Sequence, residues 1–158
     1  MAVDRSLRTL ELLLEKYRAD VDARADALAK ALAHEQRAIA ATSAAEMHTR
    51  TAHAALEAAR NEQRSNTQTA TTADALQWGR RFIERRSDEL AIAKTAESKA
   101  RSALDEARTI VERARTALGE ARGKVEAITK RIAAAKKAAA DRVEAVAEEE
   151  AADRWRRS

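Results

Sequence analysis

The feature that most constrains this chain is a seven-residue repeat of apolar side chains in its second half. Counting in sevens from Leu76 to Val146, aliphatic residues occupy every position except Glu97 and Ala139. From Leu90 to Ile132, the third residue after each of these positions is alanine except at Ile128. Two sets of apolar positions at this spacing are typical of helices that pack as a coiled coil. We name the first set the large seam and the second the alanine seam.

In this half the large seam comprises Leu76, Ile83, Leu90, Glu97, Leu104, Val111, Leu118, Val125, Ile132, Ala139 and Val146, and the alanine seam comprises Ala93, Ala100, Ala107, Ala114, Ala121, Ile128 and Ala135. The first half repeats the arrangement. Its large seam contains Leu7, Leu14, Val21, Leu28 and Leu56, and its second seam contains Leu10, Tyr17, Arg24, Ala31, Ala38, Ala45, Ala52 and Ala59. Alanine at alternate core positions lets two helices approach more closely than the usual distance of about 8–10 Å.

The composition favours the same fold class. The 158 residues include no proline, no cysteine, 3 glycines and only four aromatic residues, and 35% of them are charged. Such a chain lacks the large side chains that a thick globular core needs, and its composition is that of long helices. Without cysteine it cannot hold a disulfide framework. Strands are nearly excluded.

One polar segment separates the two helical stretches. Residues 65–72 carry short hydroxyl and amide side chains, which compete for backbone hydrogen bonds and disfavour helix. We therefore expect a single all-α domain over residues 1–158, a long two-helix antiparallel coiled-coil hairpin with an alanine-rich core. Its expected parts are a helix over about 4–64, a turn over about 65–73, and a helix over about 74–155 that overhangs the first beyond about Lys137. Asp4 and Ser6 are candidate N-caps of the first helix, and Thr72 or Asp74 of the second.

Residues that would point to catalysis are missing. The sequence has no glycine-rich phosphate loop and no nucleophile elbow, and His34, His48 and His53 do not converge with carboxylates at a metal-ligand spacing. Most carboxylates have an arginine or lysine three or four residues away, as helix-surface pairs do. We expect no enzyme, no cofactor and no metal. Because 30 basic residues are nearly balanced by 26 acidic ones, we also expect no nucleic-acid partner.

An aromatic and arginine cluster begins the second helix. Trp78, Phe82 and Ile83 share one helix face, with Arg86 one turn further on. Such a cluster has the composition of an interaction hot spot. Two alternatives are that the aromatic side chains cap the end of the hairpin, or that they stack on single-stranded nucleic acid. Trp155, near the end of the second helix, is either a docking residue or a stray aromatic on a frayed end.

These features resemble the FliJ/YscO-type central stalk proteins of type III secretion systems. The resemblance rests on the leucines near the start (Leu7, Leu10 and Leu14), on the two-helix pattern, and on the second helix opening with Trp78 to Phe82 and Ile83. The richness in alanine and arginine resembles the version that belongs to Hrp-type injectisomes, which serve virulence in plant-associated bacteria.

The resemblance implies a function and a set of partners. Members of the family insert their two termini into the hexameric export ATPase and point the hairpin tip at the cytoplasmic domain of the export gate. By analogy, Leu7, Leu10, Leu14 and Trp155 would bind the ATPase, and Trp78, Phe82, Ile83 and Arg86 would bind the gate. Members can also bind export chaperones, and some are themselves secreted.

A different class of function stays open. The same seams could pair between chains, so that the protein is a self-associating structural coiled coil or a chaperone-escort scaffold. No apolar run approaches the roughly 18 residues that a membrane span requires, and residues 1–8 do not form a signal peptide. We therefore expect a cytoplasmic protein without membrane insertion, and the resemblance implies a position peripheral to the inner-membrane secretion apparatus.

Overall fold

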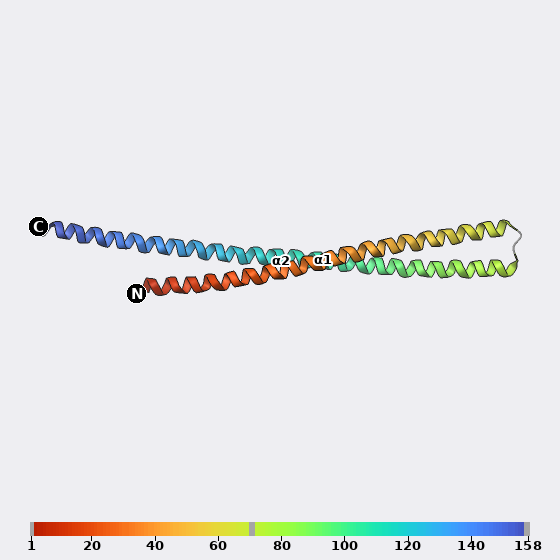
Figure 1. Cartoon of the computed structure of the whole chain (residues 1–158), viewed down its shortest axis with the longest axis horizontal. Helices are drawn as coiled ribbons and strands as arrows, with labels where there is room; N and C mark the ends of the chain where they lie inside the picture. The colour runs from red at the N-terminus through yellow and green to blue at the C-terminus, as the bar shows by residue number, and fades with distance from the viewer. Residues whose placement is uncertain (1, 70–71, 157–158) are drawn as a thin grey trace. The chain divides into compact units, whose positions relative to one another are not determined.

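Two long helices make up nearly all of the described chain. The computed structural model describes residues 2–69 and 72–156, with side chains from residue 5 onward. Helix α1 spans Ala2–Gln68 and helix α2 spans Ala73–Arg156 (Figure 1). Within the described ranges there is no strand. The expectation of an all-helical fold of two long helices packed against each other is confirmed, and the packing is compatible with a helical hairpin.

Helix α1 continues into the polar segment that we expected to be a turn. The hydroxyl of Thr67 donates to the carbonyl oxygens of Gln63 (3.0 Å) and Arg64 (2.8 Å), and that of Thr69 donates to the carbonyl of Ser65 (3.2 Å). The Ser65 carbonyl also accepts from the backbone N–H of Thr69 (3.2 Å), so the hydroxyl is a second donor to a carbonyl that already has a backbone partner. The short polar side chains therefore bond to the preceding turn of α1 without breaking it, and the helix ends at Gln68, not near residue 64.

Thr72 caps the start of α2, as one of the two expected candidates. Its hydroxyl oxygen accepts a hydrogen bond from the backbone N–H of Ala75 (3.4 Å), and its carbonyl accepts the first helical bond, from Leu76 (3.2 Å). Asp74 lies in the first turn of α2, where its negative charge complements the helix dipole. At the other helix start, Ser6 lies inside α1 and does not cap it, and the side chain of Asp4 lies outside the described residues.

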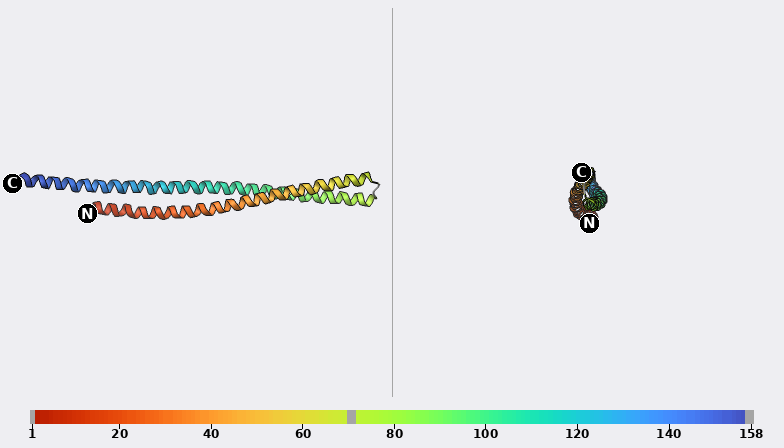
Figure 2. Two further views of the ribbon diagram at one scale, coloured as in Figure 1. Left: turned by 45° about the horizontal axis from the view of Figure 1, so that its top comes forward. Right: turned by 90° about the vertical axis from the view of Figure 1, so that its right-hand side faces the viewer.

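The chain divides into two compact units, and each contains a segment of both helices. The first, which we name the turn unit, contains residues 30–112; the second, the terminal unit, contains residues 1–29 and 113–158. Within the turn unit, the end of α1 and the start of α2 lie side by side, and the interhelical turn joins them (Figure 1). Within the terminal unit, the start of α1 lies beside the second half of α2 (Figure 2).

Burial follows the seven-residue spacing that the sequence predicts. In the turn unit, Leu90, Ala93 and Ala107 are buried on α2, and Ala38 and Leu56 are buried on α1. In the terminal unit the buried side chains are Leu118, Ala121, Ile128 and Ile132, all from α2. The facing seam residues of α1 (Leu7, Leu10, Leu14, Tyr17, Val21 and Leu28) are only half-buried, and Arg24 is exposed. Arginine does not enter the seam because its charge binds Asp20 on the helix surface instead (3.3 Å).

Polar residues interrupt the large seam of α1 in the turn unit, and each has a partner. The buried hydroxyl of Thr42 donates to the carbonyl of Ala38 (2.8 Å) and lies 3.2 Å from the carbonyl oxygen of Ala100 on α2. Seven residues earlier, Glu35 forms an ion pair with Arg108 of α2 (3.9 Å). Among the described residues, no buried side-chain nitrogen or oxygen lacks a hydrogen-bond partner. The seam thus tolerates polar residues because they bond across it.

Glu97, the charged residue in the large seam of α2, belongs to a further cross-helix contact. Its carboxylate binds the guanidinium of Arg101 (2.7 Å), and the same guanidinium binds Glu46 of α1 (3.1 Å). The Glu97 side chain is only 18% exposed, so this position is not simply an open edge of a thin core. One arginine that joins two carboxylates from different helices favours a single alignment of α1 against α2 at this level.

Candidate partner-binding surfaces

A ladder of stacked side chains runs along α2 beside the turn. The rings of Trp78 and Phe82 are nearly parallel, with an interplanar angle of 6° and centroids 5.5 Å apart. The guanidinium of Arg86 lies over the Phe82 ring, 5.0 Å from its centroid. We name the side chains of Trp78, Phe82 and Arg86 the ladder. Residues four apart are neighbours on a helix surface, so this spacing brings the three side chains together without help from another element.

Glu89 holds the cationic end of this ladder. Its carboxylate accepts from Arg86 at 2.6 Å and lies 3.5 Å from the Arg85 guanidinium. An ion pair at this degree of exposure contributes only a few tenths of a kcal/mol to stability. Its effect is to fix the direction of the Arg86 side chain, so that the guanidinium stays against the ring.

The ladder exposes a large apolar surface. Trp78 is 69% exposed, whereas Phe82, Ile83 and Arg86 are half-buried. The aromatic side chains therefore do not close off the turn as a buried cap would. A wide, preorganised aromatic and arginine surface of this kind is typical of the centre of a protein interface.

A hollow of about 280 Å³ adjoins Trp78, between the end of α1 and the start of α2. The amide of Gln63 reaches across it and donates to the carbonyl of Leu76 (3.4 Å). A Cβ atom at Gly79 would overlap the Gln63 side chain, so glycine is what lets that amide lie against α2. Gln63 could not be identified from the sequence, because no residue-level pattern marks a glutamine whose partner lies across a turn.

The leucine side chains near the start of α1 are less exposed than the side chains of an unoccupied docking surface would be. Leu7, Leu10 and Leu14 are all half-buried in the terminal unit. Leu12 lies outside both seams and is 68% exposed. It is a candidate contact that the seven-residue repeat does not mark, and its sequence signal is a leucine outside that repeat.

The end of α2 forms an exposed segment, residues 140–156, which we name the overhang. All of its residues are exposed, and it passes beyond the start of α1 (Figures 1 and 2). Its apolar side chains include Val143 (70% exposed), Val146 (54%) and Trp155 (88%). Arg154 lies 3.9 Å from Glu150, and Arg156 lies 3.7 Å from Asp153, so the charges near Trp155 pair within the helix.

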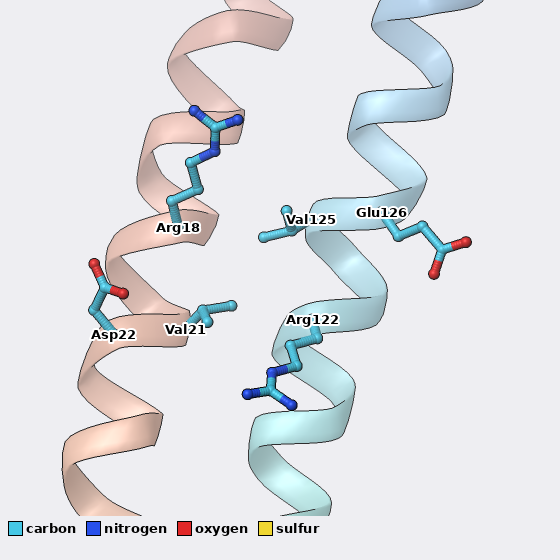
Figure 3. Close-up of a pocket in the computed structure, with 6 residues that line it drawn as sticks. All are labelled: Arg18, Val21, Asp22, Arg122, Val125 and Glu126. Atoms are coloured by element: carbon cyan, nitrogen blue, oxygen red, sulfur yellow. The ribbon is translucent and has the colours of Figure 1, made fainter.

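A groove between the helices in the terminal unit is a further surface that the sequence did not indicate. Figure 3 shows Val21 of α1 and Val125 of α2 pointing toward each other across it. The hollow has a volume of about 380 Å³, and Arg18, Asp22 and Arg122 also line it. Both valines are only half-buried, so the two helices leave apolar surface uncovered at this level.

Glu126, on the outer side of this groove, is held as a carboxylate. Its side chain points away from α1 (Figure 3) and binds the Lys130 ammonium at 2.6 Å. The hydrogen bond from Lys130, followed by the attraction between the two charges, lowers the pKa of Glu126, and the same contacts raise the pKa of Lys130. Both groups are fully exposed, so this pair sets local charge rather than fold stability.

Comparison with known proteins adds no assignment. No protein family, curated protein or solved structure matches this chain. Over the residues that the structure describes, no group of three or more histidine or acidic side chains could hold a metal ion, and neither helix is apolar enough to cross a membrane. The resemblance to central stalk proteins and the assignment of site residues to two partners therefore stay predictions.

Proposed function

We propose that this protein is a non-enzymatic central stalk of a bacterial type III secretion system. It would link the hexameric export ATPase to the cytoplasmic domain of the export gate and promote protein export. The observation that carries the proposal is the exposed ladder of Trp78, Phe82 and Arg86 beside the interhelical turn. An aromatic surface this exposed on a pair of helices with a thin core has no role within the fold, which favours a partner there.

An antiparallel coiled-coil hairpin is the fold that this role requires. Three contacts in the turn unit support it: Gln63 with Leu76, Glu46 with Arg101, and Glu35 with Arg108. From the first of these contacts to the third, the residue number falls in α1 while it rises in α2, as it does when two helices run antiparallel. In the terminal unit, Glu11 and Lys136 (3.4 Å) continue the same trend.

The ATPase contact would lie in the terminal unit, which contains the start of α1 and the overhang. Leu7, Leu10 and Leu14 would supply half-buried apolar surface, and Trp155 an exposed anchor. The mechanism would be allosteric. A stalk that contacts one arrangement of ring subunits more strongly than another shifts the ring toward that arrangement, and only this differential affinity can change its turnover.

The gate contact would lie on the ladder. Trp78 and Phe82 would bury apolar area against the gate, Ile83 would extend that surface, and Arg86 would bind an acidic group. An alanine substitution at a hot-spot aromatic costs about 2 kcal/mol or more of binding free energy, which corresponds to a roughly 30-fold weaker complex.

The first test measures ATP turnover by an Hrp-type export ATPase while this protein is titrated in. The full chain should stimulate turnover, and a chain ending at Ala135 should lose the effect. Trp155→Ala, at a side chain that is 88% exposed, tests the anchor without disturbing the fold. Trp78→Ala is the matched control, because it removes the same side chain from the other proposed surface and should leave stimulation intact.

The second test measures binding to the isolated cytoplasmic domain of the export gate by calorimetry. Here the two tryptophan variants should exchange roles: Trp78→Ala weakens binding and Trp155→Ala does not. A chain that neither stimulates the ATPase nor co-elutes with it contradicts the stalk mechanism. Equal effects of both variants in both assays would contradict the division of the surfaces.

A further inference from the structure

Two surfaces of the terminal unit leave apolar side chains uncovered, and one is a groove while the other is a ridge. One is the groove around Val21 and Val125, an apolar hollow between two helices (Figure 3). The other is the overhang, a helix whose Val143 and Val146 are 70% and 54% exposed. Residues three apart lie on the same side of a helix, so these valines form an apolar ridge. A ridge of one helix fits a groove between two others.

The two surfaces are also complementary in charge. Residues 113–139 of α2, which include one wall of the groove, contain eight basic and two acidic side chains. Residues 141–153 of the overhang contain six acidic side chains and one basic. The acidic and basic segments follow each other along one continuous helix, so within a chain they cannot lie against each other. The overhang and the groove wall can therefore attract each other closely only when they come from different chains.

We propose that the overhang of one copy of this protein docks into the groove of a second copy, and that the second overhang docks into the first groove. The two copies would be related by a two-fold axis, with their α2 helices antiparallel. Such an interface uses the same patches twice and closes on itself, so it forms a dimer and not a filament. The occupant of the groove is therefore a second copy of this chain.

The antiparallel arrangement brings the charges into register with the valines. When Val146 lies level with Val125 of the partner copy, the residues after Val146 run beside the residues before Val125. Glu149 and Glu150, which lie on the same side of the helix as Val146, then approach the basic pair Arg122 and Lys124. Within its own helix Glu150 forms an exposed contact to Arg154 at 3.9 Å, which a closer partner can replace.

Sedimentation equilibrium of the full chain tests this proposal with paired charge reversals. The groove variant carries Arg122→Glu and Lys124→Glu, and the overhang variant carries Glu149→Lys and Glu150→Lys. All four positions are exposed, so helicity by circular dichroism should stay unchanged. A matched control for the groove variant, Lys94→Glu with Lys99→Glu, makes the same change in net charge on exposed residues of the turn unit.

We expect a dimer whose dissociation constant rises with salt, because the charge pairs are screened. Each reversal variant should weaken it by at least about tenfold, since each replaces attractive pairs by repulsive ones on both halves of the interface. The chain that combines both reversals restores opposite charges and should recover the wild-type dissociation constant. The matched control should leave that constant unchanged.

Three results would overturn the proposal. They are a full chain that sediments as a monomer at every concentration, a dimer that neither reversal weakens, and a combined variant that does not recover. The experiment needs no secretion component, so its outcome is independent of whether the chain acts as a stalk.

Discussion

Ala107 is the position at which the close approach of the two helices can be tested most directly. Its side chain is 0% exposed in the alanine seam of the turn unit, and Ala93, two heptads earlier in the same seam, is 1% exposed. Replacing Ala107 by leucine adds three carbon atoms where the neighbouring atoms already exclude solvent. Leucine and alanine are both strong helix formers, so the substitution changes packing with little effect on helix propensity.

Two effects of opposite sign compete at this site. If the helices could separate to make room, the added carbons would contribute about 2.4 kcal/mol, at about 0.8 kcal/mol for each buried carbon. Inserting extra carbons into a close-packed core costs typically about 1–3 kcal/mol. Complete burial leaves no free space around Ala107, so we expect Ala107→Leu to lower the free energy of unfolding by about 1–3 kcal/mol.

Urea unfolding followed by circular dichroism measures this change. Ala103→Leu is the matched control, because Ala103 is exposed on the same helix one turn earlier and should change stability by less than about 0.5 kcal/mol. An Ala107→Leu chain that is as stable as the parent, or more stable, would refute the argument. It would mean that the seam is small because the core is thin and not because the helices are close.

Three further predictions concern single positions. Gly119→Ala and Gly123→Ala should each raise the free energy of unfolding by about 0.5–1 kcal/mol in the same assay, because an added Cβ meets nothing within 4 Å and alanine favours helix; a loss of stability would contradict this. Thr42→Val should lower it by about 0.5–1.5 kcal/mol by removing a buried hydroxyl that reaches both helices, and an unchanged value would show that this hydrogen bond contributes nothing. Carbon-13 NMR should find Glu126 titrating below its ordinary pKa of 4.5, with the shift lost in Lys130→Gln, and a titration at or above 4.5 would be inconsistent with the ion pair. Because that pKa is lowered in the folded state, the ion pair between Glu126 and Lys130 is fully formed above pH 4.5 and is lost as the pH falls through the lowered value.

Part of the candidate surface beside the turn could be predicted from spacing alone. Trp78, Phe82 and Arg86 are four residues apart, so their shared face follows from the helix period. The position of Gln63 could not be predicted in this way, because its contact with Leu76 depends on how the chain crosses the turn. Nor did the polar composition of residues 65–68 reveal that α1 continues to Gln68, with the Thr67 hydroxyl bonded back to the carbonyl of Gln63.

The sequence by itself determined the two helices and the faces that they bury. Helix propensity and the seven-residue spacing act within each helix, so Leu90, Ala107 and Leu118 could be assigned to the core without knowledge of the partner helix. Tertiary structure alone decided which residues meet across the seam. It joined Arg101 to Glu46 as well as to Glu97, and it left a hollow between Val21 and Val125. The reason is physical: alanines present nearly the same small surface at every heptad, so they fix the face of a helix but only weakly its alignment along a partner.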